Sequence, residues 1–335
     1  MKYPSTLICA CSEISIKYEE FIELTPVYHE ICSSNFVNQK WIDHLFQIGN
    51  LYHSSFHDVA SLQFQALKSL CRLTKETINS SLTQFYSTRL ITNQLISKNI
   101  FENRIDEIIN LFKKSTRHTF KEIFQIAREI FHGNTLLSIN EKTWKYQIFP
   151  VNGKSIVYAI PVTYNNGQCT CGTSLHCVEL AMLNNTPIDG LFFGCYPIEA
   201  MLNSSLECLY NETCLDLILP SFHQDLINIT IQPLQSETKF GIRETVQHMI
   251  DRLFVNEWNK NYSYLNYSRK CSSTECSYSF IQNFGALHIL TTILDLYGCL
   301  TILLSLLIPF IIGVFFRIYD RRRQMVIAPD IMTVD

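Results

Sequence analysis

A stretch of twenty-one residues without a single charge, residues 296–316, constrains this chain more than any other feature. An α-helix rises about 1.5 Å per residue, so the stretch would span roughly 31 Å, close to the thickness of the hydrocarbon core of a bilayer. Thr301 and Ser305 carry its only aliphatic hydroxyl groups. The stretch therefore predicts a transmembrane helix in a lipid bilayer. The alternative is a buried core helix.

Basic residues follow this stretch directly and predict its orientation. They are Arg317, Arg321, Arg322 and Arg323. Positive residues beside a spanning helix tend to stay in the cytoplasm, and residues 271–296 on the other flank contain no Lys or Arg. We therefore expect a plasma-membrane protein with an extracellular N-terminal region and a short cytoplasmic tail.

Cysteine usage favours the same compartment, because disulfides persist outside the cytosol and are rare within it. Twelve of the thirteen cysteines precede the apolar stretch, and Cys299, inside it, is expected to stay a free thiol. The twelve fall into blocks of four, six and two: Cys9, Cys11, Cys32 and Cys71; Cys169, Cys171, Cys177, Cys195, Cys208 and Cys214; Cys271 and Cys276. Because each block is even, we expect the bridges to close within blocks, although spacing alone does not fix the pairing.

Glycosylation acceptors form a third line of evidence, since all seven Asn-x-Ser/Thr triplets precede the apolar stretch. Asn184 is a poor candidate because Pro187 follows its triplet, and Asn79 lies in a helical pattern. The five favoured acceptors are Asn203, Asn211, Asn228, Asn261 and Asn266. Each would have to lie on the surface of an extracellular domain.

The beginning of the chain does not look like a secretory signal. Residues 1–11 contain one lysine and a short apolar run at residues 7–10. We therefore expect a further segment before Met1. The alternative is a tail-anchored protein whose larger part faces the cytosol.

The region before the anchor has the composition of a globular domain, with 47% hydrophobic and 12% aromatic residues in the chain. A formal net charge of −3 excludes the strongly basic footprint of a nucleic-acid-binding protein. Apolar residues recur at helical spacing over residues 58–96 and 101–131, which predicts an antiparallel helical hairpin ending at His132-Gly133. A bridge from Cys32 to Cys71 would pin the N-terminal segment onto this hairpin, whereas the alternative is a buried, reduced Cys71.

The hydrophobic period changes after Trp144. Residues 146–151 and 155–162 are β-rich and flank Asn152-Gly153, a strong hairpin signal, and a second turn is expected at residues 165–167. Helical spacing returns over residues 199–219 and 244–258. The predicted fold is mainly α with a small β-hairpin region, an α+β ectodomain braced by disulfides, plus one C-terminal transmembrane helix. Its parts are residues 1–140 (helical), 141–285 (cysteine-rich), 286–318 (transmembrane helix) and 319–335 (cytoplasmic tail).

Catalytic and metal-binding patterns are lacking in the sequence, so we predict no enzyme, no cofactor and no metal. Cys169, Cys171, His176 and Cys177 lack the paired spacings of zinc sites. Glu199 and Glu207 could share a helix face, but as a solvated surface. Within the apolar stretch, small or weakly polar residues recur every four positions, at Thr301, Ser305, Pro309 and Gly313. This stripe predicts helix packing and a possible homo-oligomer, against the alternative of plain lipid contact.

Several short motifs occur in a fixed order along nearly the whole chain. The first group is Cys9-x-Cys11, Tyr18-x-x-Phe21, His29-x-Ile-Cys32-Ser-Ser-x-Phe36 and Trp41. The second group is Cys169-x-Cys171-Gly-x-Ser174-x-x-Cys177, Gly194-Cys195-Tyr196, Ser205-Leu-Glu-Cys208-Leu-Tyr210, Cys214-Leu215 and Cys276-x-Tyr278. In this combination the chain resembles a family of cysteine-rich surface proteins, abundant in bdelloid rotifers, that end in one membrane helix. The resemblance implies a surface protein and brings no known activity.

Two departures from that family matter. Its members have a further membrane segment before the first Cys-x-Cys, and their glycine pair near the start of the span is here reduced to Tyr297-Gly298-Cys299. We expect a membrane-anchored surface glycoprotein that binds an unidentified extracellular ligand or protein. The alternative is a channel subunit that lacks an upstream membrane helix, because the layout is also similar to degenerin and epithelial sodium channel subunits, although the Gly-x-Ser selectivity element is missing from this span.

Overall fold

The computed structural model describes residues 7–49, 56–133, 143–183, 185–222, 229–235, 240–279 and 285–324. The chain divides into two compact units. The first is the domain Cys9–Cys276, and the second comprises Met1–Ile8 with Ser277–Asp335. The domain is α+β and disulfide-braced, as the sequence predicts, and the second unit carries the C-terminal apolar helix.

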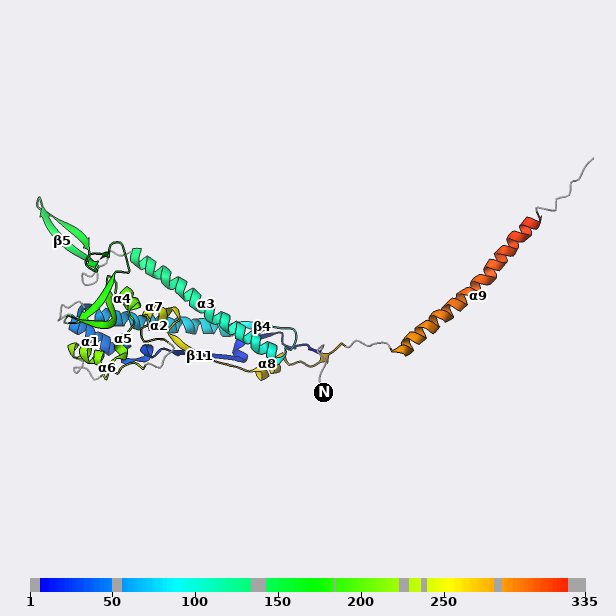
Figure 1. Cartoon of the computed structure of the whole chain (residues 1–335), viewed down its shortest axis with the longest axis horizontal. Helices are drawn as coiled ribbons and strands as arrows, with labels where there is room; N and C mark the ends of the chain where they lie inside the picture. The colour runs from blue at the N-terminus through cyan, green and yellow to red at the C-terminus, as the bar shows by residue number, and fades with distance from the viewer. Residues whose placement is uncertain are drawn as a thin grey trace, which may run out of the picture. The chain divides into compact units, whose positions relative to one another are not determined.

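Two long helices, α2 (His57–Ser87) and α3 (Lys98–Gly133), run along the domain (Figure 1). Their apolar faces meet at Phe85 and Phe112, whose ring centroids lie 4.6 Å apart. The predicted stop of the second helix at Gly133 is confirmed. The first helix ends at Ser87 and not at Ile96, because Arg89–Ile91 form strand β4, which pairs with β2 (Ser15–Lys17). Strand pairing thus overrides the helical spacing there.

One strand pair joins the two predicted parts of the domain. β3 (Ile22–Tyr28) pairs antiparallel with β11 (Val255–Tyr262). The helix predicted over residues 244–258 was wrong beyond Asp251, where α7 (Val246–Asp251) ends. Leu253 and Phe254 have positive φ angles of 59° and 52°, so the backbone leaves the helix and enters β11.

The other elements are short. The helical spacing over residues 199–219 is divided into three helices, because Leu206 and Asn211 are not helical. These are α4 (Pro197–Asn203), α5 (Glu207–Tyr210) and α6 (Glu212–Ser221). The remaining helices are the 3-10 turns η1 (Tyr18–Glu20), η2 (Glu30–Ser33) and η3 (Asn35–Val37), with α1 (Gln39–Gly49) and α8 (Tyr264–Cys271). The remaining antiparallel pairs are β7 (Thr163–Tyr164) with β8 (Cys169–Thr170) and β9 (Val178–Leu183) with β10 (Thr186–Gly194); β1 (Ile8–Cys9) lies beside β12 (Cys276–Ser277).

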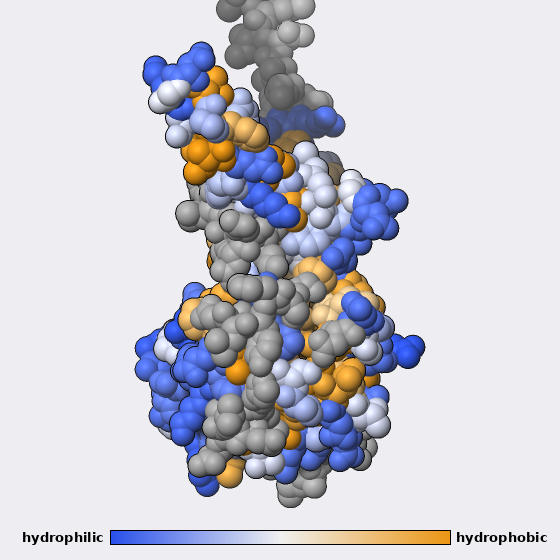
Figure 2. Space-filling view, turned by 90° about the vertical axis from the view of Figure 1, so that its left-hand side faces the viewer, coloured by the Kyte–Doolittle hydropathy of each residue, from blue (hydrophilic) through white to orange (hydrophobic). Residues whose placement is uncertain are grey.

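The predicted β-hairpin is confirmed as β5 (Trp144–Val151) and β6 (Lys154–Pro161), and it projects from the helices in Figure 1. Asn152 and Gly153 have φ angles of 52° and 73°, which suits the two-residue turn. Its apolar side chains are exposed, with Ile148 at 67% and Val157 at 59%. In Figure 2, which faces this end of the domain, hydrophobic residues lie among hydrophilic ones on the projecting part.

All twelve cysteines before the apolar helix lie in described residues and form disulfides. Four bridges close within the predicted blocks: Cys32–Cys71, Cys169–Cys177, Cys171–Cys195 and Cys208–Cys214. The expectation was wrong for the other two, which join the first block to the last: Cys9–Cys276 and Cys11–Cys271. The fold brings the end of the domain next to its beginning, and the spacing of cysteines along the sequence cannot predict such a long-range contact.

Helix α9 (Ala286–Gln324) is the one helix in the described ranges that is long and apolar enough to cross a membrane. It continues past the predicted limit at residue 318 and includes the four arginines. Cys299 is free, as expected. Thr301 and Ser305 each donate their hydroxyl to a carbonyl one turn earlier, Gly298 O and Ile302 O, both at 2.8 Å. The Ser305 hydroxyl therefore bonds within its own helix, upstream of Pro309.

Candidate functional site

A buried, two-pronged ion pair joins Arg128 on α3 to Glu199 on α4. The Arg128 side chain is 11% exposed and that of Glu199 is 1% exposed. Arg128 Nε donates to Glu199 Oε1 at 2.7 Å, and Nη2 donates to Oε2 at 2.5 Å. This two-pronged geometry matches the planar guanidinium to the carboxylate and adds both strength and direction.

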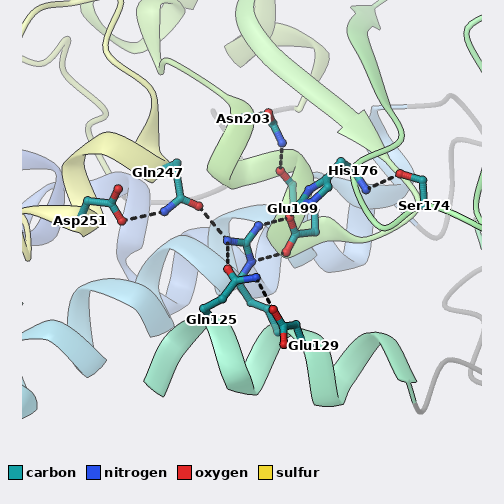
Figure 3. Close-up of polar contacts among 9 residues, drawn as sticks. Gln125, Glu129, Ser174, His176, Glu199, Asn203, Gln247 and Asp251 are labelled. Carbon is teal, nitrogen blue, oxygen red and sulfur yellow. Dashed lines mark hydrogen bonds and ion pairs between the residues drawn. The ribbon is translucent and has the colours of Figure 1, made fainter. Parts of the chain in front are cut away.

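Polar side chains from two other parts of the domain complete the ion pair (Figure 3). Arg128 Nη1 donates to Gln247 Oε1 at 3.1 Å, and Gln247 donates to Asp251 Oδ1 at 2.9 Å on α7. His176, in the loop closed by the Cys169–Cys177 bridge, places Nδ1 3.2 Å from Glu199 Oε2. The network therefore ties the C-terminal half of α3 to α4, to α7 and to the cysteine-rich loop.

Local sequence explains how Glu199 reaches this position. Pro197 begins α4, where its missing N–H is not needed, and Glu199 lies in the first helical turn. A carboxylate in the first turn also interacts favourably with the helix dipole. The side chain of Asn203, the last residue of α4, donates to the backbone carbonyl of Glu199 at 2.8 Å.

The network acts as a structural clamp. A buried ion pair stabilises little by itself, but the loss of one partner leaves a buried charge and costs about 3–5 kcal/mol. Arg128 and Glu199 thus fix α4 against α3 and set the wall of a neighbouring cavity. No described group of His, Cys, Asp or Glu side chains is arranged to hold a metal ion.

A cavity of about 400 Å³ adjoins the clamp, between α2, α3 and α4. Its lining is mostly apolar and includes Leu62, Phe124, Phe131 and Ile198. Cavities of this size with a few polar groups at the wall are typical of small-ligand sites. The clamp supplies those polar groups, since Arg128 and Glu199 both line the cavity.

Sequence reasoning missed this site. Glu199 was expected on a solvated surface beside Glu207, and this expectation is wrong because Glu199 is buried against Arg128. Glu207, in contrast, is 30% exposed and pairs with Arg243 at 3.0 Å. No local pattern distinguishes Arg128 from the other basic residues of α3, because its partner lies 71 positions away.

The predicted glycosylation acceptors lie on the surface of the domain where the structure describes them. Asn203, Asn211, Asn261 and Asn266 are exposed, and Asn228 lies outside the described residues. Asn211 also caps α6, because its Oδ1 accepts from the backbone N–H groups of Thr213 and Cys214. Their modification stays a prediction.

The cysteines Cys169, Cys171 and Cys177, which could have served as zinc ligands, all form disulfides. Cys169 and Cys171 pair with Cys177 and Cys195, and the remaining candidate, His176, faces Glu199. The stripe Thr301, Ser305, Pro309 and Gly313 lies on the exposed helix α9, the candidate membrane helix. Packing of that stripe against another helix stays a prediction.

No protein-family model, curated protein or solved structure matches the chain. The fold and the bridges define a disulfide-braced α+β domain on a chain with one candidate membrane helix, an arrangement compatible with a membrane-anchored protein.

Proposed function

We propose that this chain is a membrane-anchored cell-surface glycoprotein whose domain lies outside the cell and binds a ligand there. The observation that carries the proposal is the contrast between cysteines. Every cysteine before α9 is paired, and Cys299 within α9 is free. Pairing on this scale requires an oxidising compartment.

Three further features support this proposal. The arginines at the end of α9 favour a cytoplasmic C-terminus. Four of the five favoured acceptor asparagines are exposed on the domain. A concave, largely apolar cavity beside the Arg128–Glu199 clamp gives the domain a surface suited to binding. The resemblance to the rotifer surface proteins stays a prediction.

The test uses intact cells that express the full chain. A membrane-impermeant maleimide should label no domain cysteine before reduction, and all twelve after reduction and unfolding. Treatment with an N-glycosidase should increase electrophoretic mobility, and substitution of Asn261 and Asn266 by Gln should reduce that shift.

A Cys299→Ser variant serves as the control, because it removes the one free thiol. Native, non-reduced protein labelled at most domain cysteines, together with an unshifted band, would show a domain that faces the cytosol. That result would replace this proposal with the tail-anchored alternative.

A further inference from the structure

A second concave surface lies beside the middle of α3, and it shares Asp251 with the polar network around the clamp. Its α3 wall is formed by Asn110, Lys113, Lys114, Arg117, His118 and Lys121. These positions follow the spacing i, i+3, i+4, i+7, i+8 and i+11, so they share one face of the helix. The opposite wall consists of Asp251 and the first residues of β11, and the enclosed volume is about 630 Å³. This surface is called the basic cleft below.

Positive charge exceeds negative charge in the basic cleft. Four cationic side chains line the cleft, those of Lys113, Lys114, Arg117 and Lys121, whereas only two carboxylates do, those of Asp251 and Glu257. Lys121 Nζ forms an ion pair with Asp251 Oδ2 at 3.7 Å. Within the described part of the chain, no carboxylate lies within ion-pair distance of Lys114 or Arg117. Burial lowers the pKa of Arg117, and the nearby charge of Arg252 lowers it further. The cleft therefore holds cations whose field is not neutralised.

The floor of the cleft carries unused hydrogen-bonding groups. Among the described residues, Trp258 Nε1, a donor, and Asn256 Oδ1, an acceptor, are buried without a hydrogen-bond partner. Both residues line the cleft. A buried polar group without a partner costs roughly 1–3 kcal/mol, so a ligand that satisfied both would be favoured. The register of β11 shifts between Val255 and Glu257, an irregularity of the kind that often lies beside functional sites.

The tryptophan ring is held in place from two sides. Lys113 Nζ lies 5.6 Å from the centroid of the Trp258 ring, and the Phe112 ring meets it edge-on at 5.9 Å. The lysine is the mobile member of this stack, because its side chain has several rotatable bonds. The Lys113 side chain therefore lies over the tryptophan ring at the floor of the cleft.

We propose that the basic cleft binds a sulfated carbohydrate. Sulfate oxygens would accept hydrogen bonds from Lys114, Arg117 and Lys121. A sugar oxygen would accept a hydrogen bond from the indole N–H of Trp258, and a sugar hydroxyl would donate one to Asn256 Oδ1. The cations extend over about 12 Å of helix from Lys113 to Lys121, a distance that suits successive sulfates on one oligosaccharide better than a single inorganic ion. The assignment rests on the proposed function, since sulfated glycans are found outside cells.

The test measures binding of a fully sulfated heparin octasaccharide to the purified full chain in mild detergent. The Lys114→Gln/Arg117→Gln variant should raise the Kd at least tenfold. The Arg72→Gln/Lys98→Gln variant removes the same charge from exposed positions outside the cleft and should change the Kd by less than twofold. Trp258→Phe keeps the aromatic ring, removes the N–H, and should raise the Kd about threefold to tenfold.

Several outcomes would overturn this inference. They are an absence of octasaccharide binding by the unaltered chain, an equal loss in the cleft variant and the charge-matched variant, or inorganic sulfate competing as well per sulfate as the octasaccharide. If the labelling test places the domain in the cytosol while binding persists, the basic cleft is a general polyanion site and the glycan assignment is overturned. If the domain lies outside and binding fails, only this inference is lost.

Discussion

The two bridges Cys9–Cys276 and Cys11–Cys271 should stabilise the domain in a strongly non-additive way. They lie side by side and close nearly the same loop, with sequence separations of 267 and 260 residues. Either bridge alone therefore removes most of the freedom that the two chain ends have in the unfolded state. The second bridge then closes only the short loop made of residues 9–11 and 271–276.

The magnitudes follow from the chain-entropy relation for cross-links. A loop of about 265 residues corresponds to roughly 5.6 kcal/mol, and the short loop of about nine residues corresponds to roughly 2.6 kcal/mol. Removal of one bridge should thus lower the free energy of unfolding by about 2.6 kcal/mol, and removal of both should lower it by about 8 kcal/mol. The double loss exceeds the sum of the single losses by about 3 kcal/mol.

The assay is urea unfolding of the full chain in mild detergent, followed by tryptophan fluorescence. The variants replace each cysteine pair by alanine, singly and together. The Cys9/Cys276 pair gives the cleaner single value, since Cys276 is exposed, whereas Cys271 is fully buried and its replacement also leaves a small cavity. Single losses that add up to the double loss would refute the shared-loop reasoning.

Three further outcomes are expected. Arg128→Met should lower the free energy of unfolding by about 3–5 kcal/mol, since it leaves the buried Glu199 carboxylate without its arginine partner. Burial lowers the pKa of His29 to about 4, so the unfolded chain binds this proton more readily than the native state does. The free energy of unfolding should therefore be independent of His29 above pH 6.5 and should fall by about 3 kcal/mol as the pH drops to 4. Gly190→Ala should destabilise by more than 1 kcal/mol, because φ is +73° and the new methyl group would meet Glu207.

Each of these has a direct control. Lys98→Gln breaks an exposed pair with Glu102 and should change stability by less than about 0.5 kcal/mol, and an equal effect from Arg128→Met would contradict the clamp. In acid unfolding, His29→Gln should remove the slope between pH 6.5 and 4, whereas the exposed His118→Gln should keep it. Stability of Gly190→Ala within error of the unaltered protein would show that the backbone of β10 around Gly190 adapts freely.

The geometry around His29 gives the pH prediction its structural basis. His29 is 1% exposed, its Nδ1 accepts from the Ile31 N–H at 3.1 Å, and its Nε2 lies 2.9 Å from the Tyr210 hydroxyl. A neutral ring satisfies both contacts. A proton on Nδ1 would remove the bond to Ile31 and place a charge among buried aromatic rings, including that of Phe240. The native state therefore resists protonation of His29 until the pH is well below the pKa that this histidine has in the unfolded chain.

The sequence alone determined the features that depend on near neighbours. The apolar run indicated where α9 lies, the spacing of apolar residues gave α3 and most of α2, and Asn152-Gly153 gave the β5–β6 turn. Periodicity and turn chemistry act within a few residues, so they can be read directly from the order of amino acids. The cysteine count likewise indicated a disulfide-braced domain.

Only the tertiary structure decided which distant residues meet. It paired Cys9 and Cys11 with Cys276 and Cys271, and it turned residues 255–258 from a predicted helix into β11 through the partner strand β3. It also buried Glu199 against Arg128. These outcomes depend on burial and on partners far away in the chain, and a side chain's local pattern carries no record of the partner that will neutralise it or of the strand that will satisfy its backbone.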